Sequence, residues 1–171
     1  MSAVPGSADP VLLARPATTD DLADLVRLAG LARAEVEGER GGALLLAREY
    51  TGWTAPDRWS DVLGTDAGTV LVGCIGTVVV AYGVATVEQL DGAPLAIIEA
   101  IFVEPGAREV GVGHSLMDAL VRFARDRGCR GIDARALPGD RDTKNFFESS
   151  GLVARLLTVH RDLTADDGGP G

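Results

Sequence analysis

The chain has 171 residues, enough for one ordinary domain and too few for two, and 46% of them are hydrophobic. Aromatic residues make up only 5%, so an aliphatic core is expected. The formal net charge of −9 argues against a nucleic-acid-binding protein, because phosphate backbones need a positively charged face. The charge weakly favours a cationic or amine partner, although an acidic surface that keeps a protein in solution is the better explanation.

The sequence also indicates where in the cell the protein is expected to be. Residues 1–10 contain neither a basic start nor an apolar stretch, so no signal peptide is expected. The longest apolar runs, such as 77–81, are too short to cross a bilayer. Cys74 and Cys129 lie in apolar, strand-like segments, where buried free thiols are expected rather than a disulfide or a metal site. These features predict a cytoplasmic protein that binds neither a membrane nor a metal.

The chain begins with a predicted strand at 11–15, and the segments 1–10 and 164–171 at its two ends are expected to be loose. Thr18 and Asp21 resemble a capping box, which predicts that a helix starts there. The positions that follow have the spacing of an amphipathic helix: Leu22, Leu25, Val26, Ala29, Ala32 and Val36.

Residues 38–64 are harder to interpret. A second helix at 43–50 is one interpretation, and the stretch around Trp53 and Trp59 is predicted to be a loop. Packing in the core is the expectation for at least one of these two tryptophans.

Three strand-like runs occupy the middle of the chain. The first is 70–75, and a long β-branched run follows at 77–89. Asp91-Gly92 is a hairpin signal, so the next run, 94–103, is predicted to pair antiparallel with the run before it.

The last part of the chain alternates helices and strands. A helix is predicted at 111–127, a half-buried strand at 130–137, and a short helix between Asp140, its N-cap, and Gly151. The final strand is predicted at 152–163. This order, with adjacent strands in the middle, predicts one α+β domain spanning 11–163 with a mixed sheet, rather than a doubly wound fold.

The segment 103–113, VEPGAREVGVG, carries the clearest chemical signal, because it follows a predicted strand and opens a predicted helix. Gly111 and Gly113 have no Cβ, so an anion can approach the exposed backbone N–H groups closely. The helix dipole adds positive potential at the same point, and a pyrophosphate suits such a site. Two familiar phosphate loops are excluded: His114 stands where the P-loop needs lysine, and Leu116 where the dinucleotide fingerprint needs its third glycine.

This segment resembles the coenzyme A signature of the GNAT superfamily of N-acetyltransferases, and five of its residues fall in register: Val103, Pro105, Arg108, Gly111 and Gly113. A second segment, FFESSGL at 146–152, resembles the Phe-Tyr-x-x-x-Gly-Phe segment of that family. The resemblance covers about residues 12–163 and implies a mixed, V-shaped sheet flanked by helices.

The resemblance implies that acetyl-CoA donates an acyl group to a primary amine of a small molecule, peptide or protein. It assigns the pantetheine arm to the strand end at Ile101, Phe102 and Val103. It assigns the pyrophosphate to the backbone of the loop and first helical turn: Arg108, Glu109, Val110, Gly111, Val112, Gly113 and His114. It also places one face of the short helix against the cofactor: Asp140, Thr143, Lys144 and Phe147. A solvated surface position is an equally good interpretation of Lys144.

Phe147 departs from the family pattern, because many members have at this position a tyrosine that protonates the departing thiolate. Another group or water would then protonate the thiolate, or the thiolate would leave without a proton, since a thiol is acidic enough for that. An acyl-CoA-binding regulatory module without catalysis is therefore the alternative function, and a homodimer is one assembly that the sequence leaves open.

Glu99 is the candidate general base, because an ammonium ion must lose a proton before its nitrogen can attack. It lies in an otherwise apolar run, and regular strand alternation predicts that it shares a face with Ile101 and Val103. The other interpretation is that Glu99 pairs with an arginine or anchors a neighbouring loop. His160, on the predicted last strand, is expected to be structural.

Overall fold

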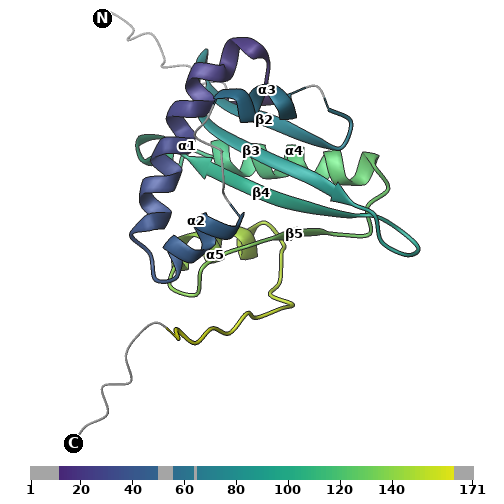
Figure 1. Cartoon of the computed structure of the whole chain (residues 1–171). Helices are drawn as coiled ribbons and strands as arrows, with labels where there is room; N and C mark the ends of the chain where they lie inside the picture. Colours follow the sequence, from purple (N-terminus) through teal and green to yellow (C-terminus); the bar gives the residue numbers. More distant parts are fainter. Residues whose placement is uncertain (1–11, 50–55, 64, 164–171) are drawn as a thin grey trace, which may run out of the picture.

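The computed structural model describes residues 12–49, 56–63 and 65–163. At its centre is a five-stranded sheet in the order β1-β2-β3-β4-β5 (Figure 1). The first four strands pair antiparallel, and β5 joins β4 in parallel, so the sheet is mixed as predicted. The strands are β1 (Leu12–Pro16), β2 (Gly68–Ile75), β3 (Val78–Glu88), β4 (Leu95–Val103) and β5 (Ile132–Ala134).

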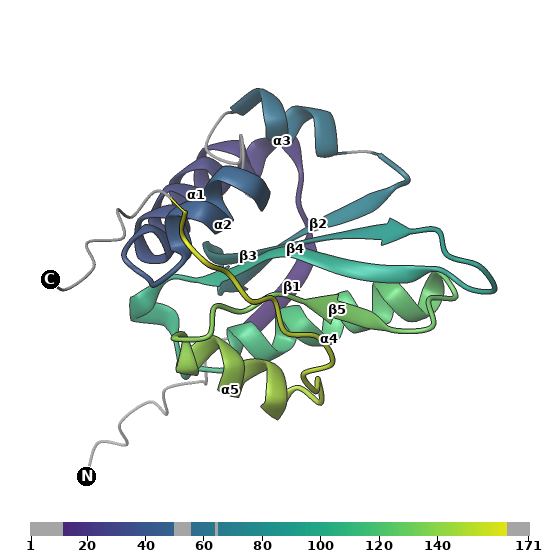
Figure 2. The same cartoon turned by 60° about the horizontal axis from the view of Figure 1, so that its bottom comes forward.

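Helices cover both faces of this sheet (Figure 2). One face carries α1 (Leu22–Glu37), α2 (Gly42–Glu49) and α3 (Pro56–Val62), and the other carries α4 (Val112–Asp126) and α5 (Arg141–Ser149). The two short 3₁₀ turns are η1 (Thr19–Asp21) and η2 (Pro105–Ala107). No helix of the described chain is both long and apolar enough to cross a membrane; the cytoplasmic location stays a prediction.

The two faces hold two cores, and alternate residues of the strands divide between them. Val70 and Val72 of β2 join the core under α1 and α3, whereas Leu71 joins the core under α4 and α5. The helix α4 buries one apolar face against the sheet: Val112, Leu116, Met117, Leu120 and Ala124. Both cysteines are free thiols, and Cys74 is buried in β2 as predicted, whereas Cys129 is only half-buried and lies outside the strands. Burial raises the pKa of the Cys74 thiol.

Close packing fixes the position of α4, whose first turn belongs to the candidate site. A Cβ on Gly73 would lie 2.7 Å from Leu116 Cδ1, and one on Gly83 would lie 2.9 Å from Leu116 Cδ2. Real Cβ atoms do not approach a neighbour this closely. The two glycines of β2 and β3 therefore let α4 lie directly on the sheet.

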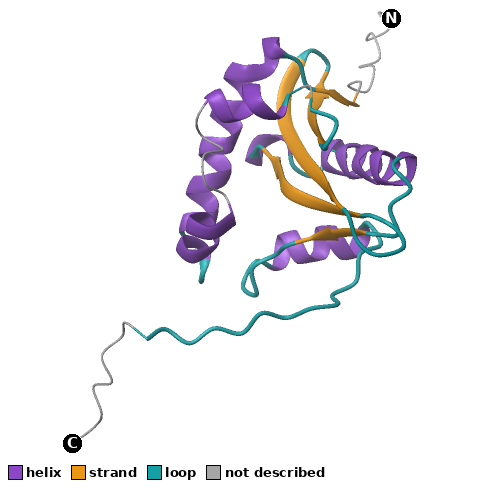
Figure 3. Cartoon of the chain, turned by 45° about the vertical axis from the view of Figure 1, so that its right-hand side comes forward, coloured by secondary structure: helices purple, strands orange, loops and turns teal. Residues whose placement is uncertain are grey.

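Two predicted strands differ from the structure. The strand predicted at 130–137 is only three residues long, and residues 152–163 form no strand, although they run extended (Figure 3). The prediction at 152–163 was wrong because a strand needs a backbone partner as well as an apolar pattern, and no described segment pairs with it.

The interpretation of 38–64 was partly right. The helix considered at 43–50 exists as α2, but the stretch that contains Trp59 is the helix α3 and not a loop. The signal for α3 was present in the sequence, since Pro56 is a favoured first helical residue and Asp57 suits the first turn. Trp53 lies outside the described residues.

The start of α1 is held by an ion pair at the end of β1. The buried Asp21 carboxylate accepts hydrogen bonds from both terminal nitrogens of Arg15, at 2.8 Å each, and from the backbone N–H of Thr18, also at 2.8 Å. The Thr18–Asp21 capping box predicted from the sequence is thus present. The hydrogen bonds from Arg15 outweigh burial and lower the pKa of Asp21 to about 2, from an ordinary value of 3.8.

We expect Asp21→Asn to lower the free energy of unfolding by about 2 kcal/mol at neutral pH, because it removes charge-assisted hydrogen bonds. Since the folded pKa of Asp21 lies below the unfolded value, its contribution is complete above pH 3.8 and is lost as the pH falls toward about 2. Urea unfolding at a series of pH values measures this. The exposed neighbour Asp20 provides the matched control, Asp20→Asn, and an equal loss in both variants would contradict the assignment.

Candidate active site

The strands β4 and β5 separate beyond their first few residues. They pair only where Ala96–Ile98 lies beside Ile132–Ala134. Past Ile98, β4 continues to Val103, whereas the other strand has ended and the chain turns toward α5. The edge of β4 from Glu99 to Val103 therefore has no strand partner in the described chain on the side of β5. Its backbone groups are available to an extended ligand.

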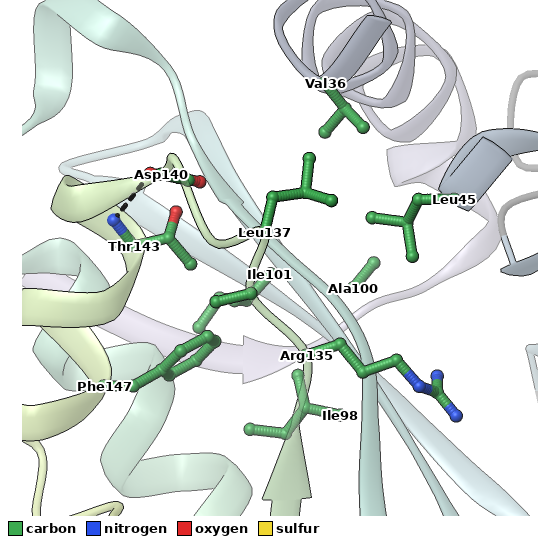
Figure 4. A pocket seen from close by; sticks show the side chains of 11 residues that line it. Val36, Leu45, Ile98, Ala100, Ile101, Arg135, Leu137, Asp140, Thr143 and Phe147 are labelled. Atoms are coloured by element: carbon green, nitrogen blue, oxygen red, sulfur yellow. Dashed lines mark hydrogen bonds between the residues drawn. The ribbon is translucent and has the colours of Figure 1, made fainter. Parts of the chain in front are cut away.

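A small pocket of about 70 Å³ lies where the two strands separate (Figure 4). Figure 4 shows the Phe147 ring pointing toward Ile101 and Leu137, while the guanidinium of Arg135 points away from Phe147. A pocket of this size admits a group of a few heavy atoms and not a drug-sized ligand. It is lined from both helical layers and from β4: Val36, Leu45, Ile98, Ala100, Ile101, Arg135, Ala136, Leu137, Asp140, Thr143 and Phe147.

The phosphate loop predicted from the sequence connects the end of β4 to the start of α4. Gly111 is the N-cap residue of α4, with a φ of 95°, and Glu109 also has a positive φ, of 67°. The first hydrogen bond of the helix runs from the Ser115 N–H to the Gly111 carbonyl, at 3.0 Å. The preceding N–H groups of the first turn, at 112–114, therefore have no acceptor within the helix, and such a helix end is suited to binding an anion.

Glu109 adds backbone strain that glycine would not, because a residue with a side chain is strained by about 1 kcal/mol or more in the left-handed region. The residues 108–110 are exposed, so solvent or a ligand can reach this turn. The sequence placed the loop correctly between β4 and α4, and its binding of a phosphate stays a prediction. The sequence gave no indication that Glu109 adopts this conformation.

The side chain of Arg108 ties the loop to α1. Its terminal nitrogen lies 2.7 and 2.8 Å from the two carboxylate oxygens of Glu35, and its Nε donates to the Val103 carbonyl at 3.1 Å. The guanidinium also stacks 5.7 Å from the Phe102 ring centroid. Arg108 thus holds the end of β4, the loop and α1 together, a partnership that the sequence did not suggest.

The first turn of α4 also contacts α5. A Cβ on Gly113 would lie 3.3 Å from both Phe146 Cε2 and Val103 Cγ2, so a side chain there would require these neighbours to shift by a few tenths of an ångström. The His114 ring packs edge-on against Phe146, with centroids 5.3 Å apart, and His114 Nε2 lies 3.3 Å from Ser149 Oγ. The ring of His114 therefore serves packing between helices.

Glu99 lies on the opposite face from the one predicted. The register of β3 and β4 places Val84 opposite Ala100 but Ala85 opposite Ile98, so Glu99 is the extra residue of a β-bulge. Ile98 joins the core under α4, whereas Ala100 joins the core under α1. The regular alternation that predicted a shared face with Ile101 and Val103 is broken at this residue.

The partners of Glu99 confirm this orientation. Its carboxylate accepts a hydrogen bond from Thr86 Oγ1 at 2.8 Å and lies 3.5 Å from Arg135 Nη1. Thr86 shares the face of Val84 by alternation, which is the side covered by α1. The Glu99 side chain is 25% exposed, so the carboxylate is held in position yet accessible. Glu99 therefore pairs with an arginine, as the alternative interpretation expected. This pairing does not exclude a second role as a base.

Three of the four residues of α5 and its cap that were predicted to face the cofactor line the pocket, and their contact with a cofactor stays a prediction. Asp140 caps the helix by accepting the Thr143 N–H at 2.9 Å, as predicted, and both residues line the pocket. Phe147 is 8% exposed and lines the pocket as well. Lys144 instead pairs with Glu148 at 3.6 Å, and its side chain is 61% exposed. The geometry thus favours the surface interpretation of Lys144.

Residues 40–152, more than half of the chain, match the Acetyltransferase (GNAT) family. The chain belongs to this family. No curated protein matches it significantly. The mixed sheet that opens between β4 and β5, with α4 beginning at the loop after β4, is thus the sheet of a GNAT acetyltransferase, as the resemblance implied.

Solved structures share this GNAT fold. A tetramutant of the BH1408 protein from Bacillus halodurans is 21% identical with a TM-score of 0.75, over 88% of this chain and 99% of that one. An aminoglycoside acetyltransferase from an uncultured soil metagenomic sample, in complex with sisomicin, is 20% identical (TM-score 0.68; 90% and 95%). Aminoglycoside N-acetyltransferase AAC(6')-Iy, in complex with CoA, is 18% identical (TM-score 0.68; 94% and 99%). At these identities the likeness shows the fold alone.

The sequence missed several residues of this GNAT site. Val36, Leu45 and Leu137 close the pocket from α1, α2 and the loop before α5. Val36 was already part of the apolar spacing predicted for the first helix. No local pattern, however, indicates that two helices and a loop meet over β4. Trp59 is fully buried and packs edge-on against Tyr82 at 5.4 Å, so it belongs to the core, as expected for at least one of the two tryptophans.

Proposed function

We propose that the protein transfers the acetyl group of acetyl-CoA to a primary amine, as an N-acetyltransferase. One observation carries this proposal: the unpaired edge of β4 leads directly into the free N–H groups at the start of α4. An extended chain that ends in a diphosphate suits such a path, since the edge offers strand-like hydrogen bonds and the helix end favours an anion. The CoA complex of the related AAC(6')-Iy supports the choice of ligand.

The residues present fit this ligand. Backbone groups of Ile101, Phe102 and Val103 would hold the pantetheine arm, and the backbone from Arg108 to His114 would hold the diphosphate. The Val103 carbonyl already accepts Arg108 Nε at 3.1 Å, but a carbonyl oxygen has two lone pairs and retains capacity for a second donor. Asp140 and Phe147 would border the arm, because they line the pocket beside β4. We assign no phosphate contact to Lys144, which pairs with Glu148.

Glu99 is the proposed general base. Acetyl-CoA supplies an activated thioester, and an amine can attack it only after the ammonium has lost a proton. The Glu99 carboxylate is partly exposed on the face covered by α1, and GNAT enzymes build the acceptor pocket partly from the segment after this first helix. Thr86 fixes one carboxylate oxygen and Arg135 lies beside the other, so the group is positioned before the amine arrives.

Phe147 carries no hydroxyl where many members have a tyrosine, and its ring lies in the pocket wall. We expect Phe147→Tyr to bind acetyl-CoA within about threefold of the parent, because one added hydroxyl at the border of a 70 Å³ pocket causes little overpacking. Calorimetric titration measures this. An affinity loss beyond about tenfold, equal to about 1.4 kcal/mol, would mean that Phe147 does not border the bound ligand as proposed.

The acceptor is proposed to be a primary amine of a small molecule, peptide or protein. The acidic chain favours cationic amines, and the sisomicin complex of a structural relative adds aminoglycosides to the candidates. The test is thiol release from acetyl-CoA in the presence of aminoglycosides, polyamines, amino acids and lysine peptides. We expect release above background with at least one amine.

The same assay separates the two functions that the sequence left open. Binding of acetyl-CoA without release for any amine would support the regulatory module that Phe147 suggests. Absence of binding would contradict both functions, because each requires the ligand at β4 and α4.

A further inference from the structure

A pair of opposite charges lies beside the pocket between β4 and β5. The Glu99 carboxylate and Arg135 Nη1 are 3.5 Å apart, and the two side chains are 25% and 44% exposed, so a ligand can reach both. Among the described residues that line the pocket, Arg135 alone carries a positive charge. An acceptor whose amine approaches Glu99 therefore meets the guanidinium of Arg135 next to it.

The backbone brings this pair to the point where the two strands separate. Ile98 and Ala134 are the last residues that pair between β4 and β5, and Glu99 and Arg135 come directly after them. The stem of Arg135 lines the pocket, while its guanidinium points away from Phe147 (Figure 4). Both charges thus lie where the edge of β4 becomes available to a ligand.

The pair has the charge pattern that complements a free α-amino acid, whose ammonium and carboxylate groups are attached to one carbon atom. An ammonium group on Glu99 brings such a neighbouring carboxylate to Arg135. The five N–H donors of a guanidinium suit a carboxylate particularly well, because two of them can bind its two oxygens in parallel.

The same arginine disfavours an acceptor with a second positive charge close to its reacting amine. Contact between like charges is one of the ways in which a protein rejects a wrong ligand. The net charge of −9 attracts cations to the chain as a whole, but salt screens exposed charges beyond about 8 Å. At Glu99 the nearby guanidinium therefore outweighs the distant acidic groups.

Building on the proposed function, we propose that Arg135 selects acceptors with a carboxylate next to the reacting amine, and that the acceptor is a free α-amino acid. Its ammonium loses a proton to Glu99, the nitrogen forms an amide bond to the acetyl carbon, and the C–S bond breaks to release the thiolate. The carboxylate stays ionised on Arg135 throughout. The N-terminal amine of a peptide is disfavoured, because an amide replaces this carboxylate.

The test compares each common α-amino acid with the corresponding amino acid amide, which keeps the amine and side chain but lacks the negative charge. Thiol release from acetyl-CoA gives kcat/KM for both acceptors. We expect the parent to prefer the reactive amino acid over its amide at least tenfold. Arg135→Gln should reduce this ratio at least tenfold, whereas a residue that only positions Glu99 would lower both values equally.

Arg130→Gln is the matched control, because it removes the same charge from an exposed residue at the other end of β5. It should leave the ratio of acid to amide unchanged. The comparison within each variant also cancels the difference in basicity between the two amines.

Two results would overturn the selection of a carboxylate and leave the proposed N-acetyltransferase intact. One is that amides, polyamines or aminoglycosides react as well as free amino acids in the parent. The other is that Arg135→Gln lowers kcat/KM equally for the acid and the amide. Thiol release with no amine at all would contradict both the selection and the proposed function.

Discussion

Replacing Glu99 with glutamine is expected to lower turnover about a hundredfold, the usual contribution of a positioned base. The amide has nearly the same shape and still bonds Thr86, but it cannot take a proton from an ammonium ion. Binding of acetyl-CoA should stay within about threefold of the parent, because backbone groups hold it. Steady-state kinetics with the acceptor found in the amine screen, combined with titration of acetyl-CoA, separate the two effects.

Glu104→Gln is the matched control for Glu99→Gln. Glu104 follows the same strand and is also paired with an arginine, Arg27, at 2.9 Å, yet it has no assigned role in the reaction. Turnover of the Glu104 variant should stay near the parent value. Turnover of Glu99→Gln within about threefold of the parent would reduce Glu99 to a structural residue, since a base contributes far more.

The second large effect is expected at the phosphate loop. Val110 is 46% exposed beside the free N–H groups of α4, so Val110→Glu places a negative charge at the diphosphate site with little loss of packing. We expect the affinity for acetyl-CoA to fall at least tenfold, equal to about 1.4 kcal/mol. The rise in melting temperature that acetyl-CoA causes should shrink accordingly, because a ligand stabilises only the state that it binds.

Val110→Gln isolates the charge, because it has almost the same shape as the glutamate variant. Its affinity for acetyl-CoA should remain within about threefold of the parent, since no charge meets the diphosphate. Equal affinities in the two variants would show that the negative end of the ligand lies elsewhere.

Much of the fold could be predicted because local pattern and tertiary structure agree. The spacing of apolar residues located α1 and α4, and Asp91-Gly92 located the antiparallel pairing of β3 with β4. The position of the loop that is predicted to bind the diphosphate could be recognised because its glycines serve a local need, a left-handed N-cap at Gly111 and close packing at Gly113.

The remaining features depend on contacts that no local pattern encodes. A bulge at Glu99 reversed its face, and periodicity cannot reveal an inserted residue. The bond between Arg108 and Glu35 joins residues far apart in the sequence. Residues 152–163 have the composition of a strand, but whether a strand forms depends on a partner that the sequence pattern does not specify.

The most direct test of the proposed site compares two donors by calorimetry, acetyl-CoA and S-acetylpantetheine, which shares the thioester arm but lacks the diphosphate. The parent protein should bind acetyl-CoA at least tenfold more tightly than the fragment, and Val110→Glu should abolish that difference while leaving the fragment's affinity unchanged. If the parent bound both donors equally, or if Val110→Glu kept the full difference, the diphosphate would not lie at the start of α4 and the proposed site would be wrong.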